Sequence, residues 1–156
     1  MAADEQGVHY QVAKQLFNEK RMVDQLTGAH SMYAYTRARK LPYLIYIDHS
    51  GLMDINLQHG SEMGDRILQT TAQALMTETD EVYRHYDDKF IVQHEDWQAA
   101  HDLVFKVSND LKNKRIVFRT SKGELNHIHG IHIYYDVGDE FIYVENNVLI
   151  NKFNWN

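Results

Sequence analysis

The segment from Leu41 to Ile47 constrains the fold of this chain more than any other. Every residue in it is aliphatic, aromatic or proline, and Asp48 follows directly. Pro42, the single proline of the chain, fixes the backbone at the start of the run. A short apolar run that ends at an acidic residue predicts a central strand covered on both faces. A carboxylate at the end of such a strand is costly unless it binds a metal or hydrogen-bond donors. Asp48 is therefore a candidate ligand or catalytic residue, with capping of the next turn as the alternative.

Helical periodicity lies on both sides of this strand. Residues 8 to 26 predict an amphipathic helix, which either packs on its own domain or leads into it as a signalling or dimerising helix. Three more helices are predicted over Ser31 to Lys40, from about Glu62 to Thr77, and from an Asp96 N-cap to about residue 113.

Alternating apolar residues predict the remaining strands. Glu81 to Tyr83 and Lys89 to Gln93 form the arms of a hairpin, and Arg115 to Thr120 pairs with a long strand from Leu125 to Tyr135. A short helix over 139–147 and an edge strand over 148–153 complete the chain. Two successive strand-helix-strand units predict an α+β fold of the ferredoxin-like type, with a central, mostly antiparallel sheet and flanking helices.

Composition narrows the functional classes. A length of 156 residues fits one domain, and the absence of cysteine excludes disulfides and makes the cytoplasm the expected compartment. The N-terminus lacks the features of a signal peptide, and no apolar run approaches the length of a membrane span. A net charge of −6 without a dense basic stripe argues against nucleic-acid binding.

Several motifs, in order and at matching spacing, resemble those of the GGDEF domain, the fold of the diguanylate cyclases, which is similar to the palm of nucleotidyl cyclases. The matching pieces are Asp24-x-Leu26-Thr27-Gly28 for DxLTG, Asp48 after the first strand, Asn56 with Gly60-x-x-x-Gly64-Asp65, Arg84-His85-Tyr86-Asp87-Asp88-Lys89-Phe90 for RxGGDEF, Gly130, and Asp139 with Tyr143. The match runs from about residue 24 to residue 151. The resemblance implies an N-terminal helix, residues 1–23, followed by a degenerate GGDEF domain, residues 24–156.

The resemblance also implies a reaction and its ligands. In this family two GTP-loaded domains face each other and make cyclic di-GMP with the help of a divalent metal. Asp48 and Asp88 stand at the two metal-carboxylate positions, and the backbone carbonyl of His49 stands at a third. Oxygen ligands of this kind suit Mg²⁺. Asn56 and Asp65 stand where the family holds guanine.

Other positions depart from the family pattern. Tyr86 and Asp87 replace the two glycines, and Lys89 replaces the catalytic glutamate, so the hairpin from Tyr86 to Phe90 is expected to be vestigial, with no catalytic residue. The inhibitory site is expected to be absent, because Thr77 replaces the arginine of RxxD and only Asp80 is kept. The remaining departures concern metal and phosphate binding and fall at Ser50, Met53, Asn146 and Ile150.

These losses predict a non-catalytic regulatory module of bacterial cyclic-di-GMP signalling, which requires no cofactor. It is expected to act through protein partners, and a second copy of the chain is one of the partners considered. One alternative is a GTP-binding sensor without turnover, in which Mg²⁺ accompanies GTP and Lys89 contacts a phosphate. The other is a residual diguanylate cyclase.

The histidines provide a rival signal. His127, His129 and His132 invite a Zn²⁺ or Ni²⁺ site, but the absence of a cysteine or a nearby carboxylate on that face favours a strand face that is either solvated or satisfied within the core. His85 is expected to be an ordinary exposed histidine rather than a pH sensor.

Overall fold

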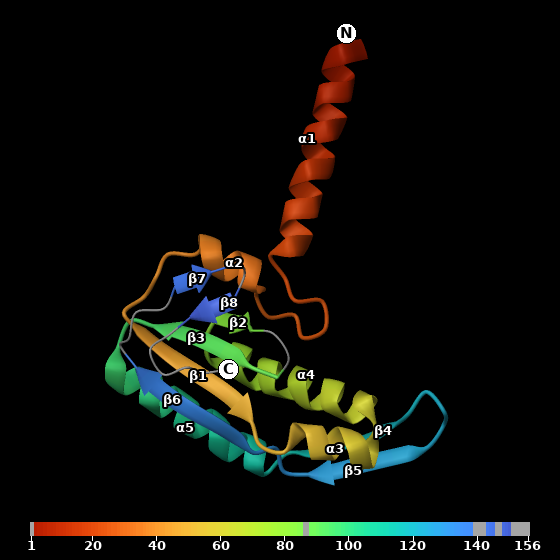
Figure 1. The fold of residues 1–156 in the computed structure, drawn as a ribbon, viewed down its shortest axis with the longest axis vertical. Coiled ribbons are helices and arrows are strands. Elements are labelled where there is room, and N and C mark those ends of the chain that lie inside the picture. The colour runs from red at the N-terminus through yellow and green to blue at the C-terminus, as the bar shows by residue number, and fades with distance from the viewer. Residues whose placement is uncertain (1, 86–87, 139–142, 146–147, 151–156) are drawn as a thin grey trace.

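The computed structural model describes residues 2–85, 88–138, 143–145 and 148–150, and the side chains of residues 7–16, 19–85 and 88–138. Figure 1 shows a sheet with helices packed against it and one long helix that projects away from it. The elements are α1 (Ala2–Arg21), α2 (Met32–Arg37), β1 (Tyr43–His49), α3 (Leu52–His59), α4 (Ser61–Glu78), β2 (Val82–Arg84), β3 (Phe90–His94), α5 (Trp97–Lys112), β4 (Arg115–Arg119), β5 (Leu125–His129), β6 (Ile133–Gly138), β7 (Tyr143–Glu145) and β8 (Val148–Ile150).

The central sheet has the strand order β2-β3-β1-β6, and every neighbouring pair is antiparallel. Strand β1 therefore lies inside the sheet, where Tyr46 pairs with Ile91 of β3 on one side and with Asp136 of β6 on the other. Strands β4 and β5 form a separate antiparallel pair, as do β7 and β8. This topology confirms the predicted ferredoxin-like α+β fold.

Both faces of β1 are covered, as its apolar sequence predicts. Ile45 and Ile47 point into the main core, together with Met63 of α4 and Val104 of α5. Leu44 and Tyr46 point to the opposite face and pack in a smaller cluster with Tyr35 of α2. Alternate side chains of a strand point to opposite faces, so only a continuous apolar run can fill both cores. Burying each aliphatic side chain stabilises the fold by about 1.5–3 kcal/mol.

Helix α1 projects away from the domain (Figure 1). Val8, Val12 and Leu16 recur every four residues on this helix, and each is between 50% and 62% exposed. Of the two alternatives for this helix, the structure contradicts packing on its own domain. None of the described helices is long and apolar enough to cross a membrane.

The base of α1 is fixed to the domain by a turn and an ion pair. The Asp24 carboxylate accepts hydrogen bonds from the backbone N–H of Thr27 at 3.0 Å and from its hydroxyl at 2.5 Å. The same carboxylate pairs with the Arg84 guanidinium at 3.1 Å. The turn that follows α1 is thus attached to β2, the strand that leads into the hairpin.

The structure differs from the sequence-based prediction in three segments. Helix α3 was not predicted, because Leu52 is its single buried residue and its other side chains give little periodicity. The strand predicted over 125–135 is divided at Gly130, whose φ of +89° turns the chain from β5 into β6. Residues 143–145 form strand β7 rather than part of a helix, while 139–142 and 146–147 lie outside the described residues.

Candidate functional site

The pairing of β1 with β3 brings the two halves of the candidate site together. Ile47 lies opposite Phe90 in this register. Asp48 and His49, which follow Ile47, therefore lie beside Asp88 and Lys89, which precede Phe90. The two metal-carboxylate positions inferred from the family resemblance thus meet at one end of the sheet.

Lys89 lies against both carboxylates and is only 7% exposed. Its Nζ atom is 3.1 Å from Oδ1 of Asp88 and 3.9 Å from Oδ2 of Asp48. A charged hydrogen bond at the first distance is strong, and the second contact is a looser ion pair. The residue that replaces the family's glutamate therefore neutralises part of the charge of this acidic site.

The two carboxylates respond differently to their surroundings. Burial raises the pKa of Asp48, and the nearby charge of Asp88 raises it further, although the His49 N–H and Lys89 oppose both effects. Burial would also raise the pKa of Asp88, but the hydrogen bond and the charge of Lys89 outweigh it and lower that pKa. Asp88 is accordingly the main partner of the ammonium group, in agreement with the shorter distance.

The His49 side chain holds the hairpin against α4. Its Nδ1 atom lies 2.6 Å from the backbone carbonyl oxygen of Asp88, and its Nε2 atom lies 2.8 Å from the Thr71 hydroxyl. A carbonyl only accepts, so Nδ1 carries the hydrogen. Burial lowers the pKa of His49 and favours the neutral ring. The Thr71 hydroxyl beside Nε2 also lies 2.9 Å from the Ile67 carbonyl of its own helix. Sequence reasoning assigned only the His49 carbonyl, although the β1 alternation of Ile45, Ile47 and His49 points its side chain inward.

The residues of this site do not fit a divalent metal ion as they stand. Mg²⁺ requires oxygen ligands at about 2.0–2.1 Å in octahedral geometry. The Lys89 ammonium is instead already in hydrogen-bond contact with Asp88. A doubly charged ion about 4 Å from an ammonium group is repelled by roughly 2 kcal/mol even at the dielectric constant of water. Among the described residues, no group of three or more His, Asp or Glu side chains is arranged to hold a metal.

A cleft of about 640 Å³ adjoins the carboxylates. Its lining residues are Leu52, Met53, Asn56, Leu57, Ser61, Leu68 and Asp88. The cleft thus joins a predicted guanine position, Asn56, to a predicted metal position, Asp88. The other predicted guanine position, Asp65, is exposed on α4 and does not line this cleft.

Gly64 explains how Asn56 fits beside α4. A Cβ atom at Gly64 would lie 2.1 Å from Oδ1 of Asn56, which real side chains cannot tolerate. The Oδ1 atom is buried and accepts no hydrogen bond from the described residues. Gly64 therefore makes room for the Asn56 side chain in this position, which a larger residue would displace.

The remaining predicted positions lie apart from this cluster. Ser50 donates to the Tyr134 hydroxyl at 3.1 Å, so it has a structural partner within the fold. Thr77 donates to the Gln73 carbonyl of its own helix at 2.9 Å, and Asp80 is exposed beyond that helix. Tyr86, Asp87 and Asn146 lie outside the described residues, as does the side chain of Ile150.

The structure corrects the expectation for His85. This side chain is 1% exposed, so it is buried rather than exposed. Its backbone N–H donates to the Lys89 carbonyl at 2.9 Å, which closes the hairpin and turns the ring inward. His127 and His129 are exposed on β5, which agrees with the solvated form of the favoured interpretation.

Comparison with protein families identifies the chain. The family described as "Diguanylate cyclase, GGDEF domain" matches residues 8–144. The chain therefore belongs to the GGDEF domain family, which is a family of cyclic-di-GMP signalling. No curated protein matches the chain significantly.

Solved structures of GGDEF domains share the fold at low sequence identity. The GGDEF domain of DgcB from Caulobacter crescentus, in complex with c-di-GMP, is 15% identical, with a TM-score of 0.63 over 74% of this chain and 75% of that chain. The coiled coil and GGDEF domain of the same protein is 14% identical, with a TM-score of 0.66 over 87% of this chain and 79% of that chain. The FimX GGDEF domain from Pseudomonas aeruginosa is 20% identical, with a TM-score of 0.56 over 74% and 78% of the two chains.

The buried neutral ring of His49 predicts a pH-dependent stability. Its pKa is lower in the folded chain than its unfolded value of about 6.5, so the unfolded state binds more protons as the pH falls below that value. We expect the free energy of unfolding to be highest above pH 7 and to fall between pH 7 and pH 5.5, by at most about 1.4 kcal/mol per pH unit for this one proton.

Urea denaturation at pH 7.5 and at pH 6.0 measures this difference. The His49→Gln variant should show a smaller difference between the two pH values than the wild type does. The exposed His127→Gln variant is the matched control and should behave like the wild type. An equal pH dependence in all three proteins would contradict the assignment.

Proposed function

We propose that this chain is a non-catalytic GGDEF domain that regulates cyclic-di-GMP signalling through protein contacts. One observation carries the proposal: the residue at the family's glutamate position is Lys89, whose ammonium group lies against Asp48 and Asp88. Phosphodiester formation from GTP needs a metal to stabilise negative charge and to activate the attacking hydroxyl. A lysine at this position supplies no metal ligand and reduces the negative charge that would hold the ion.

The surroundings of the cleft support the loss of turnover. None of the described residues that line it is Lys or Arg, and Asp88 adds a carboxylate to its wall. Met53, at a position where the family has lysine, is 77% exposed and cannot balance a phosphate charge. A triphosphate in this cleft would meet like charge and few charged donors.

The proposal predicts that the purified chain makes no cyclic di-GMP. After incubation with GTP and either Mg²⁺ or Mn²⁺, chromatography should detect substrate and no product, while an active diguanylate cyclase run in parallel converts GTP. The triple change Tyr86→Gly, Asp87→Gly and Lys89→Glu restores the family motif. If this variant is also inactive, the phosphate-side substitutions contribute to the loss; clear turnover by the wild type would exclude the proposal.

A GTP sensor without turnover is the second candidate, and the cleft beside Asn56 favours it. Asn56 lines this cleft, and its side-chain amide can exchange hydrogen bonds with the edge of a purine ring. Under this candidate, calorimetry should detect GTP binding at high micromolar concentration, and Asn56→Ala should weaken it by about tenfold or more, the effect of one lost hydrogen bond of 1.4 kcal/mol. Asn109→Ala, an exposed asparagine on α5, is the control. No heat with the wild type would exclude the candidate.

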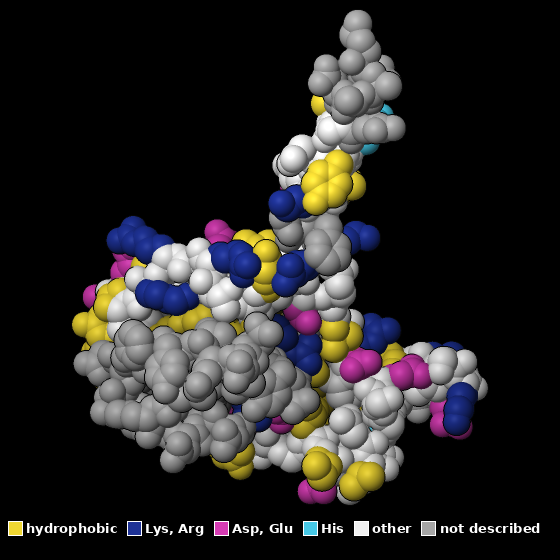
Figure 2. Space-filling view, turned by 45° about the horizontal axis from the view of Figure 1, so that its top comes forward, with side chains coloured by type: hydrophobic (Ala, Val, Ile, Leu, Met, Phe, Trp, Pro, Cys, Tyr) yellow, Lys and Arg dark blue, Asp and Glu magenta, His cyan; other side chains and the backbone are white. Residues whose placement is uncertain are grey.

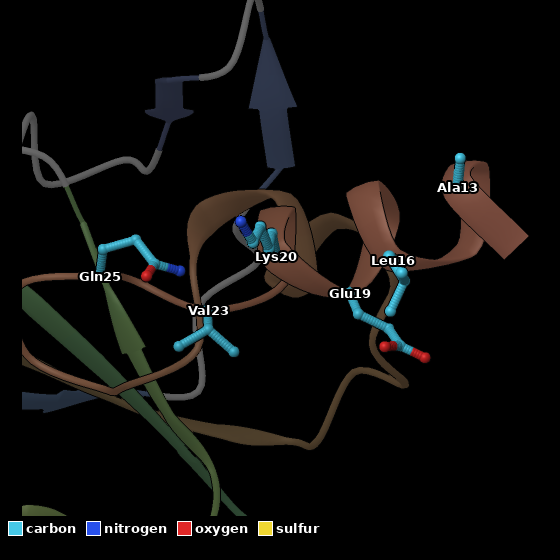
Figure 3. A pocket seen from close by; sticks show the side chains of 6 residues that line it. All are labelled: Ala13, Leu16, Glu19, Lys20, Val23 and Gln25. Carbon is cyan, nitrogen blue, oxygen red and sulfur yellow. The ribbon is translucent and has the colours of Figure 1, made fainter.

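Helix α1 is the surface that we propose for protein contact. Its exposed residues Val8, Val12 and Leu16 follow one face. At its base lies an open depression of about 660 Å³, lined by Ala13, Leu16, Glu19, Lys20, Val23 and Gln25 (Figure 3). Lys and Arg side chains gather around the base of α1 and over α2 (Figure 2). The helix projects away from the sheet (Figure 1), and its three exposed apolar residues are followed at the base by Glu19 and Lys20. A second copy of the helix, which carries the same apolar residues and both charges, is the simplest partner for it.

This surface predicts self-association that depends on α1. Burying one such side chain is worth about 1.5–3 kcal/mol, so Leu16→Glu should weaken association by about tenfold or more. Sedimentation analysis over a concentration series measures this effect. Gln11→Glu places the same charge on a different face of the helix and should leave association unchanged. A chain that stays monomeric at every concentration, or two variants with equal effects, would contradict the prediction.

A further inference from the structure

The candidate site already contains a cation that belongs to the chain. The Lys89 ammonium group lies between two carboxylates that come from different strands, at 3.1 Å from Asp88 and 3.9 Å from Asp48. We propose that Lys89 is the resident cation of this site and that the site therefore takes no divalent metal ion. The inference rests on the proposed function, because it concerns the ligand of the same site and gives the reason for the lost chemistry.

The fold holds this lysine in place from several directions. Phe90, the next residue, is fully buried in β3, and the Lys89 carbonyl accepts the His85 N–H at 2.9 Å. The Lys89 side chain is 9% exposed, so its ammonium cannot turn into solvent without leaving its buried position. The ammonium group is therefore a fixed part of the site rather than a mobile surface charge.

The His49 ring holds the backbone of Asp88 in place through a hydrogen bond to its carbonyl oxygen. It donates from Nδ1 to the carbonyl of Asp88 at 2.6 Å and is itself bound to Thr71 of α4. The backbone that carries the Asp88 side chain is thus tied to a helix of the main core. The site is held together from β1, from the hairpin and from α4 without any added ion.

The charges of the three side chains explain the exclusion of metal. Two carboxylates and one ammonium carry a sum of −1, and a divalent ion would raise it to +1 while facing the ammonium directly. Without the lysine charge, two partly buried carboxylates would carry −2 and would be matched by one divalent ion. Carboxylate oxygens are the ligands that Mg²⁺ and Mn²⁺ prefer, so removing one positive charge should create a metal site.

Titration with Mn²⁺ alone, without nucleotide, tests the inference, and electron paramagnetic resonance measures the free ion. The wild type should leave Mn²⁺ free at submillimolar concentration. Lys89→Met, which keeps the side-chain length without the charge, should bind one Mn²⁺ at least about tenfold more tightly than the wild type. Lys89→Arg keeps a positive charge and should behave like the wild type. Asp48→Asn added to Lys89→Met should abolish the gain.

Thermal unfolding gives a second readout that does not depend on activity. The melting temperature of Lys89→Met should rise on addition of Mn²⁺, and that of the wild type should stay constant with Mn²⁺ or with EDTA. Lys89→Gln serves the same purpose if Lys89→Met does not fold. If neither folds, the wild-type titration decides, since absence of binding supports the inference.

Three results would overturn the inference. The first is that the wild type binds Mn²⁺ and that Asp48→Asn removes this binding. The second is that Lys89→Met binds Mn²⁺ no more tightly than the wild type. The third is that Lys89→Arg gains as much Mn²⁺ affinity as Lys89→Met. The outcomes remain distinct from those of the proposed function. A wild type that binds Mn²⁺ at this site but makes no cyclic di-GMP overturns only the inference. A wild type that makes cyclic di-GMP overturns the proposed function.

Discussion

The antiparallel pairing of β1 with β3 is the interaction on which the rest of this structure depends. It places Ile47 opposite Phe90, and both side chains are fully buried in the main core. It also places Asp48 beside Lys89 at the end of the sheet. A shift of one residue in this register would turn Ile45 and Ile47 out of the main core. The same pairing that stabilises the core therefore also determines which charged groups meet.

The charged side chains at this end of the sheet contact one another within the fold and need no added ion to hold them together. Two partly buried carboxylates are costly when nothing balances them. In this chain the Lys89 ammonium group offsets part of their charge, and the His49 ring connects the hairpin to α4. The side chains of the site thus find their partners within the chain. This is the basis for proposing a regulatory rather than a catalytic role.

The N-terminal helix and the hairpin are connected through one carboxylate. Asp24 organises the turn after α1 and pairs with Arg84, which lies at the end of β2. A partner that binds the exposed face of α1 would contact a helix whose following turn is paired with the strand next to the site. The Asp24–Arg84 ion pair is thus the contact that joins the base of α1, where we propose protein contact, to the strand that leads into the hairpin.

The sequence alone determined the α+β fold, the doubly covered strand β1 and the family, because these depend on apolar periodicity and on motifs in a fixed order. It also predicted one site made of Asp48, Asp88, Asn56 and Asp65, of which Asp65 does not line the cleft that Asn56 and Asp88 share. Only the tertiary structure decided that Lys89 pairs with both carboxylates, that the His49 ring binds the Asp88 carbonyl, and that His85 is buried. These contacts join side chains from different elements, and they follow from strand register and rotamers, which no local pattern of residues specifies.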